Sequence, residues 1–219
     1  MTSAVTSALD PFRRWAELPN LAVLDSETTG LHGQIVELGI VNGNGETLFS
    51  ERIKPTCKVE PGAQAIHGIT DADLEGLPGM PHHWERLSEI FMTHHVVIFN
   101  KAFDVYRLEA SMTAALPGWF EGPNGQGYSD MYRPWQQLQR TSECVMLAYA
   151  PVYGNWNDYH RSWRWAKLVD ACASEGVKTD DLDSAHSAVG DCLRTLRLIH
   201  KVAQKSEDSL PSVPEEGEW

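Results

Sequence analysis

Two short apolar runs that end beside carboxylates constrain this chain more than any other feature of its sequence. Leu21–Leu24 is followed directly by Asp25 and Glu27, and Val96–Phe99 is soon followed by Asp104. An acidic side chain at the end of a buried strand is costly unless a positive group neutralises it. Because a pair of divalent metal ions supplies that charge and can cleave phosphodiesters, the pattern favours a metal-dependent site at the strand ends.

The two carboxylates after the first run have a spacing that suits such a site. Residues two apart on an extended strand point in the same direction, so Asp25 and Glu27 can face one cleft. Asp104 stands at the start of a helical pattern, where an acidic residue also stabilises the helix dipole without any further function. Each of these signals is therefore weak when it is taken alone.

A third motif opens the last strong helical pattern, which runs from Ala185 to Val202. His186 and Asp191 are five residues apart, so they do not share a face of a regular helix. We therefore expect His186 in the lead-in to the helix and Asp191 one turn inside it. A lone histidine in this position would more often cap the helix or lie on the surface.

Length and composition indicate one soluble domain. The 219 residues are enough for one well-packed core, and no apolar run approaches the ~20 residues that span a membrane. Met1–Asp10 lacks the basic and apolar regions of a secretion signal, so we expect a cytoplasmic protein. Its cysteines show no metal-ligand spacing and are expected to be reduced; they are Cys57, Cys144, Cys172 and Cys192.

The formal net charge of −12 argues against a general nucleic-acid-coating protein, which usually has a basic surface. Part of the excess lies in the segment Ser206–Trp219, which is rich in Glu and Pro. Four more negative charges belong to the expected metal cluster, where bound cations would reverse the local field. The attraction for phosphate is therefore expected to be local.

The hydrophobic pattern predicts strands followed by helices with one further strand, which is typical of a mixed sheet flanked by helices. Strands are expected at 21–24, 35–41, 47–53 and 96–99, and helices at 83–92, 103–116, 142–149, 165–174 and 185–202. Short connections between the first three strands predict an antiparallel meander. We expect a loose lead-in at 1–20, one catalytic domain at 21–204 and a disordered acidic tail at 205–219.

The three motifs together resemble those of the DEDDh 3′–5′ exonucleases, the DnaQ-like branch of the ribonuclease H-like superfamily. The first is Asp25-x-Glu27-Thr28-Thr29-Gly30, the second Asn100-x-x-Phe103-Asp104 and the third His186-x-Ala188-x-x-Asp191. Residues 65–70 are similar to a further segment of the family, and the resemblance runs from about Leu21 to Lys201. It implies a ribonuclease H-like α/β fold with a mixed five-stranded sheet, namely a three-strand antiparallel meander plus parallel strands, flanked by helices.

The resemblance also implies a mechanism. Two Mg²⁺ or Mn²⁺ ions would be bound, with Asp25 bridging both. Glu27 and Asp191 would complete the site of one ion, and Asp104 would hold the other, largely through water. His186 would be the general base that takes a proton from the attacking water, and nucleoside 5′-monophosphates would be released.

Residues beside the three motifs are expected to bind the 3′-terminal nucleotide. They are Thr28, Gly30, Leu31, His67, Asn100 and Phe103. Thr28, Gly30 and Leu31 would cradle the 3′-hydroxyl and wedge the terminal base, and His67 would touch the scissile strand. Two interpretations stay open for Phe103, which either stacks on the substrate or packs in the core.

Residues 156–165 interleave aromatic and basic side chains, a composition typical of a platform for single-stranded nucleic acid. In that interpretation Arg161 and Arg164 bind phosphate. The equally weighted alternative is a loop whose tryptophans fill gaps under the sheet, with Trp165 in the core.

The expected function is a two-metal 3′–5′ exonuclease acting on DNA, with single-stranded or frayed ends preferred. An RNA 3′-end trimming exoribonuclease remains an alternative. A proofreading or repair subunit that docks on a polymerase through its acidic tail is another. A binding module that has lost its chemistry is disfavoured, because all five expected site residues are present.

Overall fold

The computed structural model describes residues 7–122, 125, 129–182 and 186–212. Five strands form a mixed sheet in the order β3-β2-β1-β4-β5. They are β1 (Leu21–Thr28), β2 (Ile35–Asn42), β3 (Thr47–Arg52), β4 (His95–Ile98) and β5 (Glu143–Cys144). The first three are antiparallel, whereas β4 and β5 run parallel to β1. The expected meander with added parallel strands is therefore confirmed.

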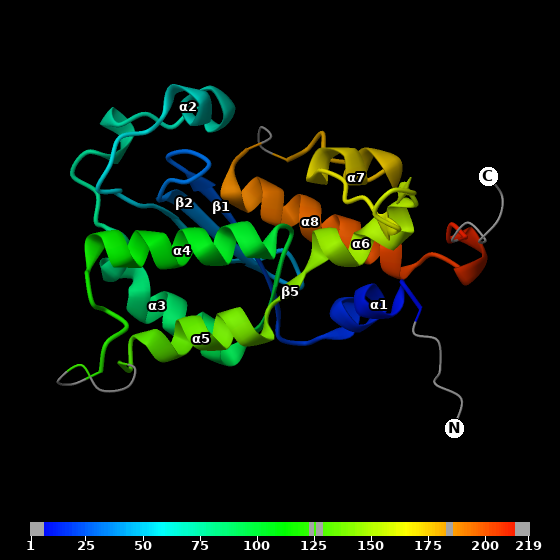
Figure 1. The fold of residues 1–219 in the computed structure, drawn as a ribbon, viewed down its shortest axis with the longest axis horizontal. Helices are drawn as coiled ribbons and strands as arrows, with labels where there is room; N and C mark the ends of the chain where they lie inside the picture. Colours follow the sequence, from blue (N-terminus) through cyan, green and yellow to red (C-terminus); the bar gives the residue numbers. More distant parts are fainter. Residues whose placement is uncertain (1–6, 123–124, 126–128, 183–185, 213–219) are drawn as a thin grey trace.

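Helices cover both faces of this sheet (Figure 1). One face packs against α3 (Met80–Thr93), α4 (Lys101–Ala115) and α5 (Tyr132–Thr141), and the other against α1 (Asp10–Glu17), α6 (Val145–Tyr153), α7 (Leu168–Ser174) and α8 (Ala188–Ala203). Alternation along β1 explains the two cores, because Ala22 and Leu24 join the first group while Leu21 and Val23 join the second. Among the described residues, no helix is both long enough and apolar enough to cross a membrane.

A further short helix, α2 (Pro61–His67), lies above the ends of β1 and β2 (Figure 1). Its start is tied to β1, since the Glu60 N–H donates to the Thr29 carbonyl at 2.8 Å. A left-handed Gly68, with φ of 75°, ends the helix. The 3₁₀ turn Ala72–Leu74 then leads the chain back toward α3.

A glycine lets α8 lie directly on the sheet. Gly39 on β2 pairs with Asp25 on β1, and a Cβ at Gly39 would lie 2.7 Å from backbone atoms of both Ala188 and Val189. Such a contact is too short for any side chain, so the close approach requires glycine at this position. The first turn of α8, which carries Asp191, is thereby held against β1 and β2.

Several sequence expectations differ from the structure in this half of the chain. The helix expected at 142–149 begins only at Val145, because Glu143 and Cys144 pair with β4 as the edge strand β5. Residues 165–174 become helical only from Leu168. The placement of Trp165 in the core is wrong: its side chain is 58% exposed.

The lead-in is not loose, because α1 contributes to the core. Phe12 and Trp15 lie three residues apart on one face of α1 and are fully buried. The Trp15 indole N–H also donates to Glu143 Oε2 at 2.9 Å. An amphipathic helix with two buried aromatic side chains outweighs the polar composition of the rest of this segment.

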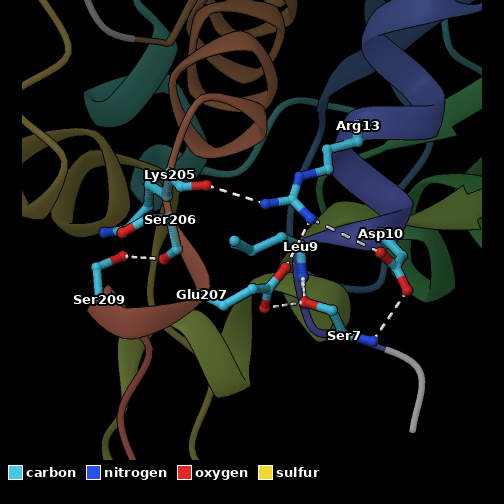
Figure 2. Close-up of polar contacts among 8 residues, drawn as sticks. All are labelled: Ser7, Leu9, Asp10, Arg13, Lys205, Ser206, Glu207 and Ser209. Atoms are coloured by element: carbon cyan, nitrogen blue, oxygen red, sulfur yellow. Dashed lines mark hydrogen bonds and ion pairs between the residues drawn. The ribbon is translucent and has the colours of Figure 1, made fainter. Parts of the chain in front are cut away.

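The first residues of the expected tail are also ordered, because Lys205 and Glu207 form polar contacts with α1 and with Ser7, which precedes it (Figure 2). Glu207 accepts hydrogen bonds from Arg13 Nη1 at 2.6 Å and from the Ser7 hydroxyl at 2.5 Å. Arg13 Nη2 donates to the Lys205 carbonyl at 3.1 Å, and Lys205 pairs with Glu175 at 2.8 Å. The expectation of a disordered tail is therefore wrong for residues 205–212, which include the 3₁₀ turn Glu207–Ser209, while 213–219 lie outside the described residues.

The contact at Gly39 predicts that Gly39→Ala lowers the free energy of unfolding by ~1–3 kcal/mol, the usual cost of overpacking. The added methyl group must push α8 away from β2, because backbone atoms cannot rotate aside. Urea unfolding followed by circular dichroism measures the change. Gly62→Ala is the matched control, since nothing lies within 4 Å of its Cβ position; equal stability of the two variants would contradict the packing argument.

Candidate active site

Four carboxylates from three elements meet at one edge of the sheet. Asp25 and Glu27 follow each other on the same face of β1, Asp104 lies in the first turn of α4, and Asp191 lies in the first turn of α8. Burial raises the pKa of Asp25 most, and repulsion from each of the other three carboxylates raises it further, so all four share one electrostatic environment. Strand and helices therefore bring together residues that are up to 166 positions apart in the sequence.

His186 joins this cluster from the segment before α8. It has φ of 74°, an uncommon backbone conformation for a residue with a side chain. Donor atoms of His186, Glu27 and Asp191 lie within 4.8 Å of one another. The expected arrangement, with His186 in the lead-in and Asp191 inside the helix, is confirmed.

The cluster is short of positive charge. Burial, followed by repulsion from Asp104, Asp191 and Glu27, holds the pKa of Asp25 well above its usual range. Burial and repulsion from neighbouring carboxylates raise the pKa of Glu27 to about 8. Burial raises the pKa of Asp104 to about 7, although the Ser26 hydroxyl donates to its Oδ1 at 2.6 Å and opposes the shift.

This donor set fits a divalent cation. Carboxylate oxygens are the ligands preferred by Mg²⁺ and related hard cations, and a bound cation would remove the repulsion that raises these pKa values. Among the described residues, a group of three potential metal ligands with close ligand atoms is found at this cluster, namely Glu27, His186 and Asp191.

One cation of the protein itself reaches the cluster, and the sequence analysis missed it. Arg194 Nη1 donates to Asp191 Oδ1 at 2.9 Å, and both side chains are largely buried. Burial raises the pKa of Asp191, while Arg194 acts to lower it. The ion pair holds one carboxylate oxygen of Asp191; the only sequence signal was an arginine three residues after Asp191 on the buried side of α8.

A fifth carboxylate, Glu37, was also missed. It lies on β2 directly opposite Glu27. Its Oε1 accepts the Ala188 N–H at 2.9 Å, and its Oε2 lies 3.4 Å from Arg52 Nε. Glu37 therefore anchors the start of α8 to the sheet, and its only sequence signal was an acidic residue within an apolar strand.

A pocket of about 420 Å³ opens beside Glu27. Its lining includes five of the expected substrate-binding residues, namely Thr28, Gly30, Leu31, His67 and Phe103. The lining also includes Ile66 on α2 and Glu60 just before it, which were not predicted as part of the site, although His67 at the end of the same helix was. Leu31 is 70% exposed and Ile66 is 57% exposed, so two apolar side chains stand free at the pocket mouth.

His67 has a clear positioning contact. Its Nδ1 accepts the Ile69 N–H at 3.0 Å, so its Nε2 carries the proton and donates to the Thr28 carbonyl at 3.1 Å. This bond joins the end of α2 to the end of β1. The Thr28 hydroxyl is directed to its own loop, where it donates to the Gly30 carbonyl at 2.9 Å.

The remaining expected substrate-binding residues lie outside the pocket lining. Asn100 precedes α4, and its carbonyl accepts the N–H groups of Phe103 and Asp104 at 2.9 and 3.2 Å. β6 (Trp156–Asn157) and β7 (Ser162–Trp163) form a hairpin. Arg161 lies in the loop of this hairpin, and Arg164 follows directly after β7. The structure therefore separates the two arginines from the residues that face Glu27.

The raised pKa of Glu27 predicts a pH-dependent gain in stability for Glu27→Gln in the metal-free protein. A folded pKa of about 8, above the ordinary 4.5, means that the folded state binds a proton more tightly than the unfolded state. The wild-type protein therefore loses stability as pH rises from about 4.5 to about 8. The variant lacks this loss, so its advantage grows over the same range, to at least about 1 kcal/mol.

Urea unfolding in the presence of a chelator at pH 5, 7 and 8.5 measures this advantage. Glu17→Gln, at an exposed position on α1, is the matched control and should show no such trend. A variant less stable than wild type at pH 8.5 would contradict the electrostatic account.

Comparisons with known proteins agree with this geometry. The family model RNase T, described as "Exonuclease", matches residues 22–125. An uncharacterized exonuclease, CP81 of Escherichia phage 186, is 31% identical over 194 residues, which cover 88% of this chain and 92% of the relative. Exodeoxyribonuclease 10 of Escherichia coli K12 is 33% identical over 91 residues, which are 38% of each protein.

Solved structures share the fold. Exonuclease X, in complex with 5′ overhanging duplex DNA, superposes with a TM-score of 0.53 and 21% identity over 87% of this chain and 96% of its own. ExoI of E. coli, in complex with single-stranded DNA, gives a TM-score of 0.55 and 18% identity over 80% of this chain and 38% of its own. With the sequence match to the phage exonuclease and the gathered DEDDh residues, the chain belongs to the DEDDh, DnaQ-like exonuclease family of the ribonuclease H-like superfamily.

Proposed function

We propose that the chain is a 3′–5′ exonuclease that removes nucleoside 5′-monophosphates from DNA, with single-stranded or frayed ends preferred. The observation that carries this proposal is the pocket beside Glu27, which adjoins the carboxylate cluster and is lined by α2, Leu31 and Phe103. A volume of about 420 Å³ suits one nucleotide rather than a continuous strand. A pocket that takes one terminal unit next to hydrolytic residues favours cleavage from an end.

The carboxylates Asp25, Glu27, Asp104 and Asp191 would hold the metal, which we propose to be a pair of Mg²⁺ or Mn²⁺ ions. Such ions neutralise the phosphate charge and lower the pKa of bound water. Ser26, which hydrogen-bonds Asp104, and Arg194, which pairs with Asp191, hold two of these carboxylates in place.

We propose His186 as the general base, and two observations support this role. Its donor atoms are near Glu27 and Asp191, and the side chain is exposed, so a water molecule can reach it. A neutral imidazole takes the proton of the attacking water and later releases it to solvent. His186 has a positive φ and lies before the first residue of α8, Ala188.

The pocket residues would bind the terminal nucleotide. Leu31 and Ile66 present exposed apolar surface from opposite sides of the pocket mouth, which suits the two faces of a nucleobase. Phe103 forms the wall nearest α4, where Arg107 stacks against its ring at 5.6 Å and donates to the Gly33 carbonyl. Arg107 thereby fixes the loop that carries Leu31.

The choice of DNA rests on the relatives' names, since the partial match is to an exodeoxyribonuclease. RNA remains the second candidate, because a similar fold is that of the nuclease domain of 3′hExo bound to rAMP, with a TM-score of 0.53 and 13% identity. Nothing in the comparisons favours a polymerase or repair partner. Of the acidic tail considered for docking, residues 205–212 pack against the domain through Glu207, and residues 213–219 lie outside the described residues.

Degradation of matched oligonucleotides tests the proposal. Single-stranded DNA, duplex DNA and RNA, each labelled at either the 5′ or the 3′ end, are incubated with Mg²⁺ or Mn²⁺. The expected result is immediate release of labelled mononucleotide from 3′-labelled single-stranded DNA, and a ladder of shortening products from the 5′-labelled strand. Asp25→Asn is the inactive control. Release of labelled mononucleotide first from the 5′ end would overturn the polarity, and faster loss of RNA would favour the second candidate.

His186→Ala should slow the chemical step by roughly 10²–10⁴-fold, the usual contribution of a general base. Single-turnover kinetics measures the step, and fluorescence anisotropy with a labelled strand measures binding, which should change little. His32→Ala, which alters an exposed histidine on the pocket-side loop, is the matched control. Near-normal turnover of His186→Ala at neutral pH would place the base elsewhere.

A further inference from the structure

The β6–β7 hairpin presents aromatic side chains to solvent. Tyr159, in the four-residue loop 158–161, is 89% exposed, and Trp165, just after β7, is 58% exposed. Isolated apolar residues on a surface need no explanation. Two large exposed rings within seven positions of each other form a local feature that the catalytic mechanism does not use.

The hairpin does not need these two rings for its own structure. Trp156 and Trp163 pair across the strands with ring centroids 5.0 Å apart. The His160 N–H donates to Asn157 Oδ1 at 3.2 Å and closes the loop, and the Arg164 N–H donates to the Asn155 carbonyl at 2.8 Å. Tyr159 meets the edge of the His160 ring, while most of its surface faces water.

Charge distinguishes this segment from the rest of the chain. Residues 155–167 contain Arg161, Arg164 and Lys167 and a single acidic residue, Asp158, so the segment is positive with neutral histidine. All four side chains are exposed. A positive, aromatic surface on a chain with a net charge of −12 is complementary to a polyanion with flat bases.

The hairpin lies away from the catalytic pocket. It follows Gly154, whose Cβ position would be 2.4 Å from the Pro211 ring, in the segment that comes after α8. Asp191 lies in the first turn of that helix, whose 16 residues span ~24 Å. Figure 1 shows the hairpin segment beside α6 and α7, toward the C-terminal end of α8. A nucleotide in the pocket cannot reach it, whereas a strand several nucleotides long can.

We propose that this aromatic–basic hairpin, residues 155–167, binds the single-stranded part of a nucleic-acid substrate at a distance from the cleaved end. Bases stack on Tyr159 and Trp165, and Arg164 contacts the phosphate backbone, as in other sequence-tolerant single-strand sites. The inference rests on the proposed nuclease function and adds a length preference to it. A protein partner is the less suitable occupant, because the exposed rings are interspersed with cations rather than joined into an apolar patch.

The test compares a trinucleotide with a 20-nucleotide single strand of DNA. For Tyr159→Ala combined with Trp165→Ala, the ratio of kcat/KM for the long strand to kcat/KM for the trinucleotide should fall by at least about 5- to 100-fold, the loss expected from even one of the two base–aromatic stacks. Met92→Ala, which truncates an exposed apolar residue on the opposite face of the sheet, should keep the wild-type ratio. An unchanged ratio in the double variant would overturn the proposal.

Binding measurements separate this inference from the catalytic one. With Asp25→Asn as the background, anisotropy of the labelled 20-mer across a salt series should show weaker binding after the aromatic changes. Arg164→Gln should reduce the slope of log K against log salt by roughly 0.7. If the wild-type protein cleaves neither strand but these binding losses appear, the nuclease proposal fails and the binding surface stands. If the double variant instead changes only self-association, measured by light scattering, the surface binds protein and the inference fails.

Discussion

Repulsion among four carboxylates at one edge of the sheet is the constraint on which the rest of the site depends. Burial and mutual proximity raise the pKa values of Asp25, Glu27 and Asp104. A fold holds such a cluster only if other interactions secure the elements that carry it. Gly39 lets α8 lie on the sheet, and Glu37 accepts a hydrogen bond from the start of that helix. The unfavourable charge thus creates the affinity for cations that the chemistry needs.

The two faces of the sheet contribute differently to this cluster. On one face α4 supplies Asp104, which is almost fully buried and hydrogen-bonded by Ser26. On the other face α8 supplies Asp191, which is balanced by Arg194. One carboxylate is therefore held by a neutral hydroxyl group and the other by a charged guanidinium. Asp191 therefore has a cationic partner within the protein, whereas Asp104 is hydrogen-bonded by a neutral hydroxyl group and its burial raises its pKa to about 7.

Motif spacing and periodicity were enough to predict the strands β1 to β4, the antiparallel meander and the residues proposed to form the site, because those features depend on local sequence. Local sequence patterns did not predict which distant segments contact one another. Glu37 became a site residue only through its register opposite Glu27, and Ile66 only because α2 lies over the end of β1. Trp15 is buried although its segment was expected to be a loose lead-in, and Trp165 is exposed although one interpretation placed it in the core. Aromatic composition alone does not say which segment packs against the core.

A nuclease with a net charge of −12 repels nucleic acid over most of its surface, so attraction must come from local positive groups near the bound strand. Two cations in the C-terminal half of α8 and just after it are already paired: Arg197 forms two hydrogen bonds with Asp181, and Lys205 pairs with Glu175. Long-range attraction is therefore weak, and screening at physiological salt weakens it further. Under these conditions the proposed mechanism holds a strand by short-range contacts, namely cations bound among the carboxylates at its end and stacking on the hairpin farther along it. The proposed preference for a single-stranded end is consistent with such contacts, because the faces of bases inside a duplex are already covered by stacking on their neighbours.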